Sequence, residues 1–247
     1  MTVSFTTLLV AAWRTLRRSA DTVTAVAGMF VFLPAYAALL LCDPIPALPE
    51  TRDEATMAAW IDAVTAWGQN FGLWFLLADL IGILGVAAIA LLLLSPKRPT
   101  AQGALRMAAA RAWPFLLASM IVALPVGLGL WLFVLPGLYI QARLIAAVPV
   151  LARRDDLGAW QAIRVSAAMT RGHGWGITGA LVTLFLMQWI VVVPLMSADE
   201  WLRAPGHGNP LLLALVDAGV AGVGAAYAVA TMLVGAVFYR LRVNSGT

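Results

Sequence analysis

Apolar stretches of about 20 residues, separated by short polar segments, recur along the chain. A helix needs about 20 apolar residues to cross roughly 30 Å of hydrocarbon, because each residue adds about 1.5 Å to its length. Four stretches fit this length directly, and they cover residues 23–41, 72–94, 175–198 and 211–239. The pattern therefore predicts an all-α protein built as a bundle of membrane-spanning helices.

The apolar region from 114 to 152 is too long for one span and just long enough for two. It contains several residues that disfavour helix, namely Pro125, Gly127, Gly129, Pro136 and Gly137. We interpret this region as a tight helical hairpin with spans at 114–132 and 134–152. The chain is then a single integral membrane domain, 1–247, with six spans.

Basic residues mark one side of this bundle. Of the 16 Lys and Arg residues, 13 fall in segments on that side: Arg14, Arg17, Arg18, Lys97, Arg98, Arg106, Arg111, Arg153, Arg154, Arg164, Arg171, Arg240 and Arg242. The opposite loops hold only Arg52 and Arg203, together with Asp43, Glu50, Asp53, Glu54, Asp62, Asp199 and Glu200. The positive-inside rule predicts a multi-pass protein of the bacterial cytoplasmic (inner) membrane, with both termini in the cytoplasm.

Each pair of spans is preceded by a short basic stretch of amphipathic character. The three sequences are FTTLLVAAWRTLRRS, ALRMAAARAWP and AWQAIRVSAAMTRGHGW. We expect amphipathic helices that lie along the inner leaflet, although basic residues in such loops also serve topology alone. In the third stretch, Asp155 or Asp156 is a candidate N-cap of a helix whose apolar face combines Leu157, Trp160, Ile163 and Ala167.

Composition supports the membrane class. Hydrophobic residues make up 62% and charged residues 11% of the chain, against roughly 25% charged in soluble domains. The net charge of +4 does not indicate a nucleic-acid partner, because the basic residues flank apolar segments. The expected partners are membrane lipids, chiefly anionic ones, with a second copy of the chain or another membrane protein as the alternative.

The sequence lacks the common motifs of soluble enzymes, including H-E-x-x-H, the phosphate-binding G-x-x-x-x-G-K-[ST] and G-x-S-x-G. The glycine-rich GHGWGITG also fails as a dinucleotide fingerprint, since Ile177 replaces the third glycine. His173 and His207 fall on opposite sides of the membrane and Cys42 is the single cysteine, so these residues cannot form one zinc site. We therefore predict no catalytic residue, metal or cofactor.

Ionisable residues inside the spans are the strongest chemical signal, because charge is costly in hydrocarbon. They are Asp79, Arg143 and Asp217, and counting along the spans places all three roughly 10 Å below the outer surface, with Gln188 slightly deeper. Arg143 is thus expected to meet one or both carboxylates in a buried polar cluster. The cluster either fixes helix packing or binds an anionic group through Arg143.

The segment from Leu132 to Ile177 resembles a bacterial group of integral membrane proteins that comprises YciC-like proteins and the membrane domain of glycerophosphoryl diester phosphodiesterases. The similar residues are Pro136, Gly137, Tyr139, Arg143, Val148, Pro149, Val150, Ala162, Arg164, Ser166, Thr170, Arg171, Gly172 and Trp175. The resemblance implies a six-span membrane domain. The phosphodiesterase activity of some relatives belongs to a fused soluble barrel, so it cannot be carried over to these residues.

Three functions remain open. The first is a non-enzymatic inner-membrane protein that binds or organises lipids or envelope partners, and it is our leading hypothesis. A transporter or translocator of lipids or small anions, using the buried Arg-Asp cluster, is the alternative. An intramembrane enzyme acting on lipid ranks below both, because the cluster offers no nucleophile or metal.

Overall fold

The computed structural model describes residues 4–97, 99–204 and 206–244, and the helices there confirm the all-α class. Arg98, one of the basic residues that predict topology, lies outside the described residues. The elements are α1 (Phe5–Arg18), α2 (Ala20–Ala27), the π-helical turn η1 (Gly28–Phe32), α3 (Leu33–Leu41), α4 (Glu54–Leu94), α5 (Ala101–Ala110), α6 (Ala112–Leu132), α7 (Val134–Leu144), α8 (Ala147–Arg153), α9 (Ala159–Met169), α10 (Gly174–Arg203) and α11 (Pro210–Asn244).

Within the described ranges, six helical segments are long and apolar enough to cross a membrane. They are Ala20–Leu41, Glu54–Leu94, Ala112–Leu132, Val134–Arg153, Gly174–Arg203 and Pro210–Asn244. Each of these segments contains one of the six predicted spans in full. The chain is therefore a polytopic membrane protein by length and composition of its helices.

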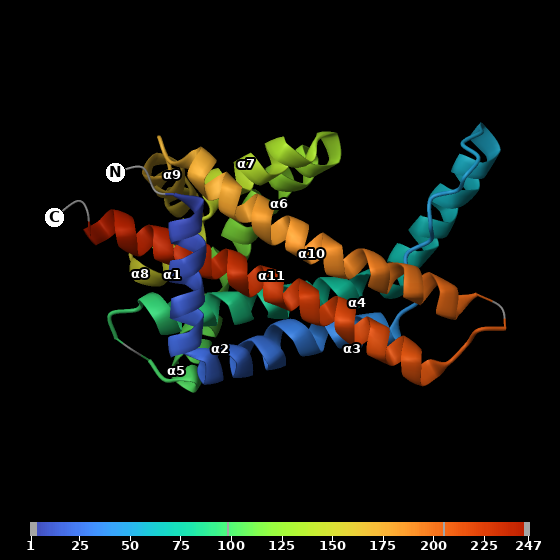
Figure 1. Cartoon of the computed structure of the whole chain (residues 1–247), viewed down its shortest axis with the longest axis horizontal. Helices are drawn as coiled ribbons and strands as arrows, with labels where there is room; N and C mark the ends of the chain where they lie inside the picture. Colours follow the sequence, from blue (N-terminus) through green and yellow to red (C-terminus); the bar gives the residue numbers. More distant parts are fainter. Residues whose placement is uncertain (1–3, 98, 205, 245–247) are drawn as a thin grey trace.

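Helices α3, α4, α10 and α11 run beside one another along the long axis of the molecule (Figure 1). Helix α11 packs against α1, α3, α4, α8 and α10 and so lies at the centre of the bundle. Helix α1 and the C-terminal end of α11 lie at the same end of the bundle, as an even number of crossings requires (Figure 1). We call this the basic end, and the opposite end, with the loops at 42–53 and 206–209, the acidic end.

The first span contains a π-helical turn where a proline interrupts its hydrogen bonding. Pro34 lacks an N–H and its ring would clash with the carbonyl of Phe30, one turn earlier. The backbone responds with the wider turn η1, which joins α2 to α3 without ending the span. Gly85 of α4 packs beside this turn, where a Cβ would lie 2.8 Å from the Cβ of Phe30.

Helices α6 and α7 form the predicted hairpin, with the reversal at Phe133. Contrary to the expected disruption, α6 continues through Pro125 and ends only at Leu132. Its backbone crosses α7 so closely that a Cβ on Gly129 would lie 2.7 Å from the Cα of Gly137. The two glycines therefore act by permitting close contact between the helices, not by breaking them.

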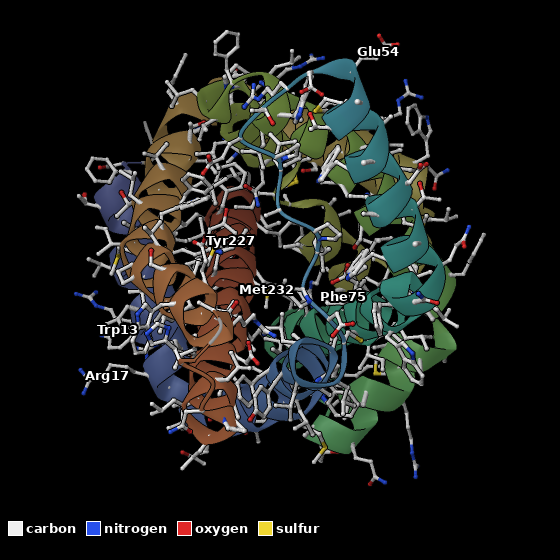
Figure 2. The ribbon with its side chains drawn as sticks, turned by 90° about the vertical axis from the view of Figure 1, so that its right-hand side faces the viewer. Trp13, Arg17, Glu54, Phe75, Tyr227 and Met232 are labelled. Atoms are coloured by element: carbon white, nitrogen blue, oxygen red, sulfur yellow. The ribbon has the colours of Figure 1, made fainter. Side chains whose placement is uncertain are left out.

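The second span is longer than predicted, because α4 begins at Glu54 instead of residue 72. Asp53 caps it: its Oδ1 accepts the Thr56 N–H at 2.8 Å and the Thr56 hydroxyl at 2.9 Å, and these bonds lower the pKa of Asp53. The indoles of Trp60 and Trp67 donate to the carbonyls of Pro46 and Asp43. This capped arm projects from the acidic end, with Glu54 at its tip (Figures 1 and 2).

The three expected amphipathic segments form α1, α5 and α9, and all three lie at the basic end (Figure 1). Helix α1 runs across α10 and α11 near that end, with Leu8 and Ala12 buried beneath it. In α9 the predicted cap is wrong. The N-cap is Gly158, whose N–H donates to Gln161 at 3.2 Å.

The predicted apolar face of α9 is also partly wrong. Its buried residues are Ala159, Ala162, Ile163 and Ser166, whereas Trp160 is 61% exposed. The aspartates proposed as caps have arginine partners instead, Arg111 for Asp155 and Arg154 for Asp156.

Candidate functional site

Arg143 lies where α7, α9 and α10 meet at the basic end. Its guanidinium donates to the carbonyl of Ala167 at 2.7 Å, and its side chain passes 3.4 Å from the position that a Cβ on Gly174 would take. No carboxylate among the described residues pairs with it. The predicted meeting of Arg143 with Asp79 or Asp217 is therefore wrong in this structure.

Several residues of the family-like segment hold this junction together. Helix α7 ends at Leu144, which leaves the Arg143 carbonyl without its usual helical donor. The hydroxyls of Thr170 and Ser166 donate to that carbonyl at 2.9 and 3.3 Å, and the Ser166 oxygen accepts the Ala146 N–H at 3.1 Å. These hydrogen bonds tie the end of α7 to α9.

The remaining segment residues shape the same junction. The rings of Tyr139 and Trp175 lie 5.3 Å apart, joining α7 to the start of α10. Gly172 has φ +78°, a left-handed conformation that reverses the chain between α9 and α10. Pro149 is buried in α8, while Arg164 and Arg171 are exposed. Packing alone accounts for most of the segment, and its two exposed arginines face away from the junction's buried side.

Asp217 has a partner that the sequence did not indicate. Its buried carboxylate lies 3.6 Å from Nη2 of Arg203, and the Nε of Arg203 donates to both oxygens of Asp199, at 3.0 and 2.9 Å. Helix α10 continues past residue 198 to Arg203, which places the guanidinium beside α11. The predicted end of this span left Arg203 in a loop, so its availability to Asp217 was missed.

Asp79 and Gln188 occupy two further places. Asp79 lines a cavity of about 520 Å³ between α3, α4, α6, α8 and α11. Gln188 lines another, of about 360 Å³, together with Gln141 and Tyr227, whose hydroxyl is 3.2 Å from the Gln141 Oε1. The four residues of the predicted cluster thus belong to four different environments. Polar character inside a span is the signal that could also have indicated Gln141 and Tyr227.

Comparison of the chain with models of protein families, with curated proteins and with solved structures found no match. The resemblance to the YciC-like and phosphodiesterase membrane-domain group therefore stays a prediction.

The arginines of the basic end divide into two kinds. Some bind backbone carbonyls at the ends of helices: Arg153 donates to Leu94 and Arg240 to Leu93 of α4, while Arg111 donates to Leu151 of α8 at 2.9 Å. Arg111 also binds Asp155 at 2.8 Å. Cations stabilise helix C-termini, so these arginines hold the basic end together.

The second kind is exposed and has no hydrogen bond or ion pair with any residue that the structure describes. These arginines are Arg14, Arg17 and Arg18 of α1, Arg106 of α5, Arg164 of α9, and Arg171 in the turn that follows. In contrast, the exposed Arg154 forms an ion pair with Asp156, and its hydrogen bond to that carboxylate lowers the pKa of Asp156. At least one free guanidinium thus lies on each amphipathic helix.

Exposed tryptophans accompany the free arginines. Trp13, Trp160, Trp113 and Trp175 are 60%, 61%, 69% and 76% exposed. Figure 2 shows Trp13 and Arg17 pointing outward from the same side of α1. Indole rings favour the boundary between hydrocarbon and headgroups, and guanidinium groups bind phosphates. The free arginines, together with the exposed tryptophans on α1, α6, α9 and α10, form a surface that can bind a lipid leaflet. We call these residues the Arg-Trp belt.

Proposed function

We propose that the protein binds anionic lipids of the cytoplasmic leaflet through the Arg-Trp belt, and that it thereby organises lipids or membrane partners in a bacterial inner membrane. The observation that carries the proposal is the exposed arginine without a protein partner on each of α1, α5 and α9. The helices lie at one end of the bundle, so their arginines can face the headgroups of one leaflet together (Figure 1). A cytoplasmic basic end follows from the positive-inside rule.

Native mass spectrometry of the protein in mild detergent tests lipid binding. The wild type and the triple variant Arg17→Gln/Arg106→Gln/Arg164→Gln, which removes one guanidinium from each amphipathic helix, are mixed with phosphatidylglycerol and phosphatidylethanolamine. We expect the wild type to retain phosphatidylglycerol preferentially and the variant to lose this preference. Each arginine near an anionic surface contributes about 1 kcal/mol to binding.

Arg52→Gln is the matched control, because Arg52 is exposed at the acidic end. The control should retain phosphatidylglycerol as the wild type does. If a folded triple variant retains it equally well, the headgroup proposal is wrong.

A transporter is the second candidate, and the open cavity at Asp79 is the observation that favours it.

A further inference from the structure

The cavity at Asp79 has apolar walls made chiefly of small side chains. Ala35 and Ala38 of α3, Gly82 of α4, and Ala221 and Gly224 of α11 face it, so the three helices leave space between them. Its volume of about 520 Å³ is in the range of pockets that hold drug-sized molecules. The cavity is thus large enough for a ligand and mostly suited to an apolar one.

Asp79 gives this cavity its only carboxylate among the described lining residues. It forms no hydrogen bond or ion pair with any residue the structure describes, whereas Asp217 is buried beside Arg203. Asp79 is also exposed, so the cavity is open where the carboxylate lies. An unpaired carboxylate inside a span is costly and marks a place where a partner binds.

An aromatic ring lies near the carboxylate on the same helix. Phe75 lines the cavity one turn before Asp79 on the same face of α4, whereas Phe115 lines it from α6 at the basic end, beneath the Arg111 guanidinium. Figure 2 shows Phe75 on the inner side of α4, between that helix and α11. A carboxylate near an aromatic ring favours an organic ammonium or phosphonium ion, through charge and cation–π attraction. The same carboxylate repels anionic headgroups.

The surrounding charge favours the same ligand. Asp79 lies 15 residues before the end of α4 at Leu94, which puts it about 22 Å from the basic end and beyond the middle of a hydrocarbon core roughly 30 Å thick. The loop at 42–53, the α4 arm and the end of α10 together contain seven carboxylates and two arginines, and Arg203 is bound by Asp199 and Asp217. The negative potential of that end raises the local concentration of cations.

We propose that the cavity binds an amphiphilic organic cation, with the positive group at Asp79 and the apolar body between α3, α4 and α11. The proposal is independent of lipid binding at the Arg-Trp belt, because the two sites lie in different halves of the bundle and select opposite charges. It extends the transporter alternative by naming the charge and class of the ligand.

Binding of tetraphenylphosphonium to the purified full chain, measured by equilibrium dialysis in detergent, tests the proposal. Tetraphenylborate is the matched probe, since it has nearly the same shape and apolar surface with the opposite charge. We expect saturable binding of the cation and at least tenfold weaker binding of the anion. Equal affinity for the two ions would overturn the proposal.

Two variants locate the site. Asp79→Asn should weaken cation binding at least tenfold, while Asp62→Asn, at an exposed carboxylate on the same helix, should leave it unchanged. Gly224→Leu should also abolish binding, because it fills the cavity from α11 at a position where a Cβ meets no atom within 4 Å. If both a folded Asp79→Asn and a folded Gly224→Leu bind the cation like the wild type, the cavity is not the site.

Discussion

Hydroxyl groups replace helical donors at the break between α7 and α8. The Arg143 carbonyl accepts from Thr170 and Ser166, and Ser166 also accepts the Ala146 N–H. Thr170 and Ser166 are fully buried, so water cannot replace these bonds. The junction thus depends on two side chains whose loss would leave backbone groups of α7 and α8 without partners.

Thr170→Val should lower stability by about 1–3 kcal/mol, since it removes a buried donor from the Arg143 carbonyl with little change of shape. Thr183→Val is the control, because the Thr183 hydroxyl bonds only to Gly179 in its own helix, at 2.9 Å. Thermal unfolding in detergent should give a clearly lower midpoint for the first variant than for the second. Equal midpoints would show that the Thr170 bond does not hold the junction.

Arg203→Leu and Asp217→Asn should be energetically coupled, because each removes one partner of the same ion pair at the acidic end. A double-mutant cycle on unfolding free energies should yield a coupling of about 0.5–3 kcal/mol. The pair of Arg203→Leu with Asp79→Asn is the comparison and should be additive, since no contact joins those residues. Additivity in both cycles would rule out the Arg203–Asp217 interaction.

At the level of elements, close backbone contacts decide how the helices pack. The α6–α7 hairpin depends on Gly129 and Gly137, and α11 passes the break after α7 at Gly235, where a Cβ would lie 2.6 Å from the Ile145 carbonyl oxygen. Pro149 has no N–H to bond that carbonyl, which helps to explain why the backbone opens there. Small residues at such crossings allow membrane helices to approach closely.

Gly137→Ala should disrupt the hairpin, because the added Cβ would lie 2.5 Å from the backbone nitrogen of Leu130. Overpacking against backbone costs about 1–3 kcal/mol or more. Gly127→Ala, in the same hairpin but with no atom within 4 Å of its Cβ, should be tolerated. The yield of monodisperse protein and its melting midpoint measure both effects. A Gly137→Ala protein as stable as Gly127→Ala would contradict the close crossing.

Apolar length was sufficient to predict the spans and the hairpin, because hydrocarbon thickness restricts what a long apolar helix can do. Apolar length could not predict the first 18 residues of α4, because the sequence from Glu54 to Phe71 mixes polar and apolar residues. The helix there depends on the Asp53 cap and on the hydrogen bonds of the Trp60 and Trp67 indoles. The turn η1 was also not predicted, because a proline inside a helix does not by itself show how the backbone accommodates the missing hydrogen bond.

At the scale of the whole molecule, the two ends differ in charge and in what they expose. The basic end presents free arginines on three short helices and exposed tryptophans beside them, and the acidic end presents carboxylates on its loops, on the α4 arm and at the end of α10. The sequence indicated Asp79, Arg143, Gln188 and Asp217 as polar residues inside spans, but it did not give their partners and it missed Gln141 and Tyr227. Counting residues also gave the wrong depth for Arg143, which lies at the basic end beside α9 and α10 because α7 ends at Leu144. Pairing depends in addition on rotation of the helix, which a residue count does not give.

Labelling of single cysteines in intact bacterial cells is the most direct test of a cytoplasmic basic end. Cys42→Ala removes the native thiol, and Thr7→Cys or Thr51→Cys then adds one at an exposed position of the basic or the acidic end. A membrane-impermeant maleimide should label Thr51→Cys in intact cells and Thr7→Cys only after lysis. Labelling of Thr7→Cys in intact cells, with Thr51→Cys protected, would contradict the orientation on which binding to the cytoplasmic leaflet depends.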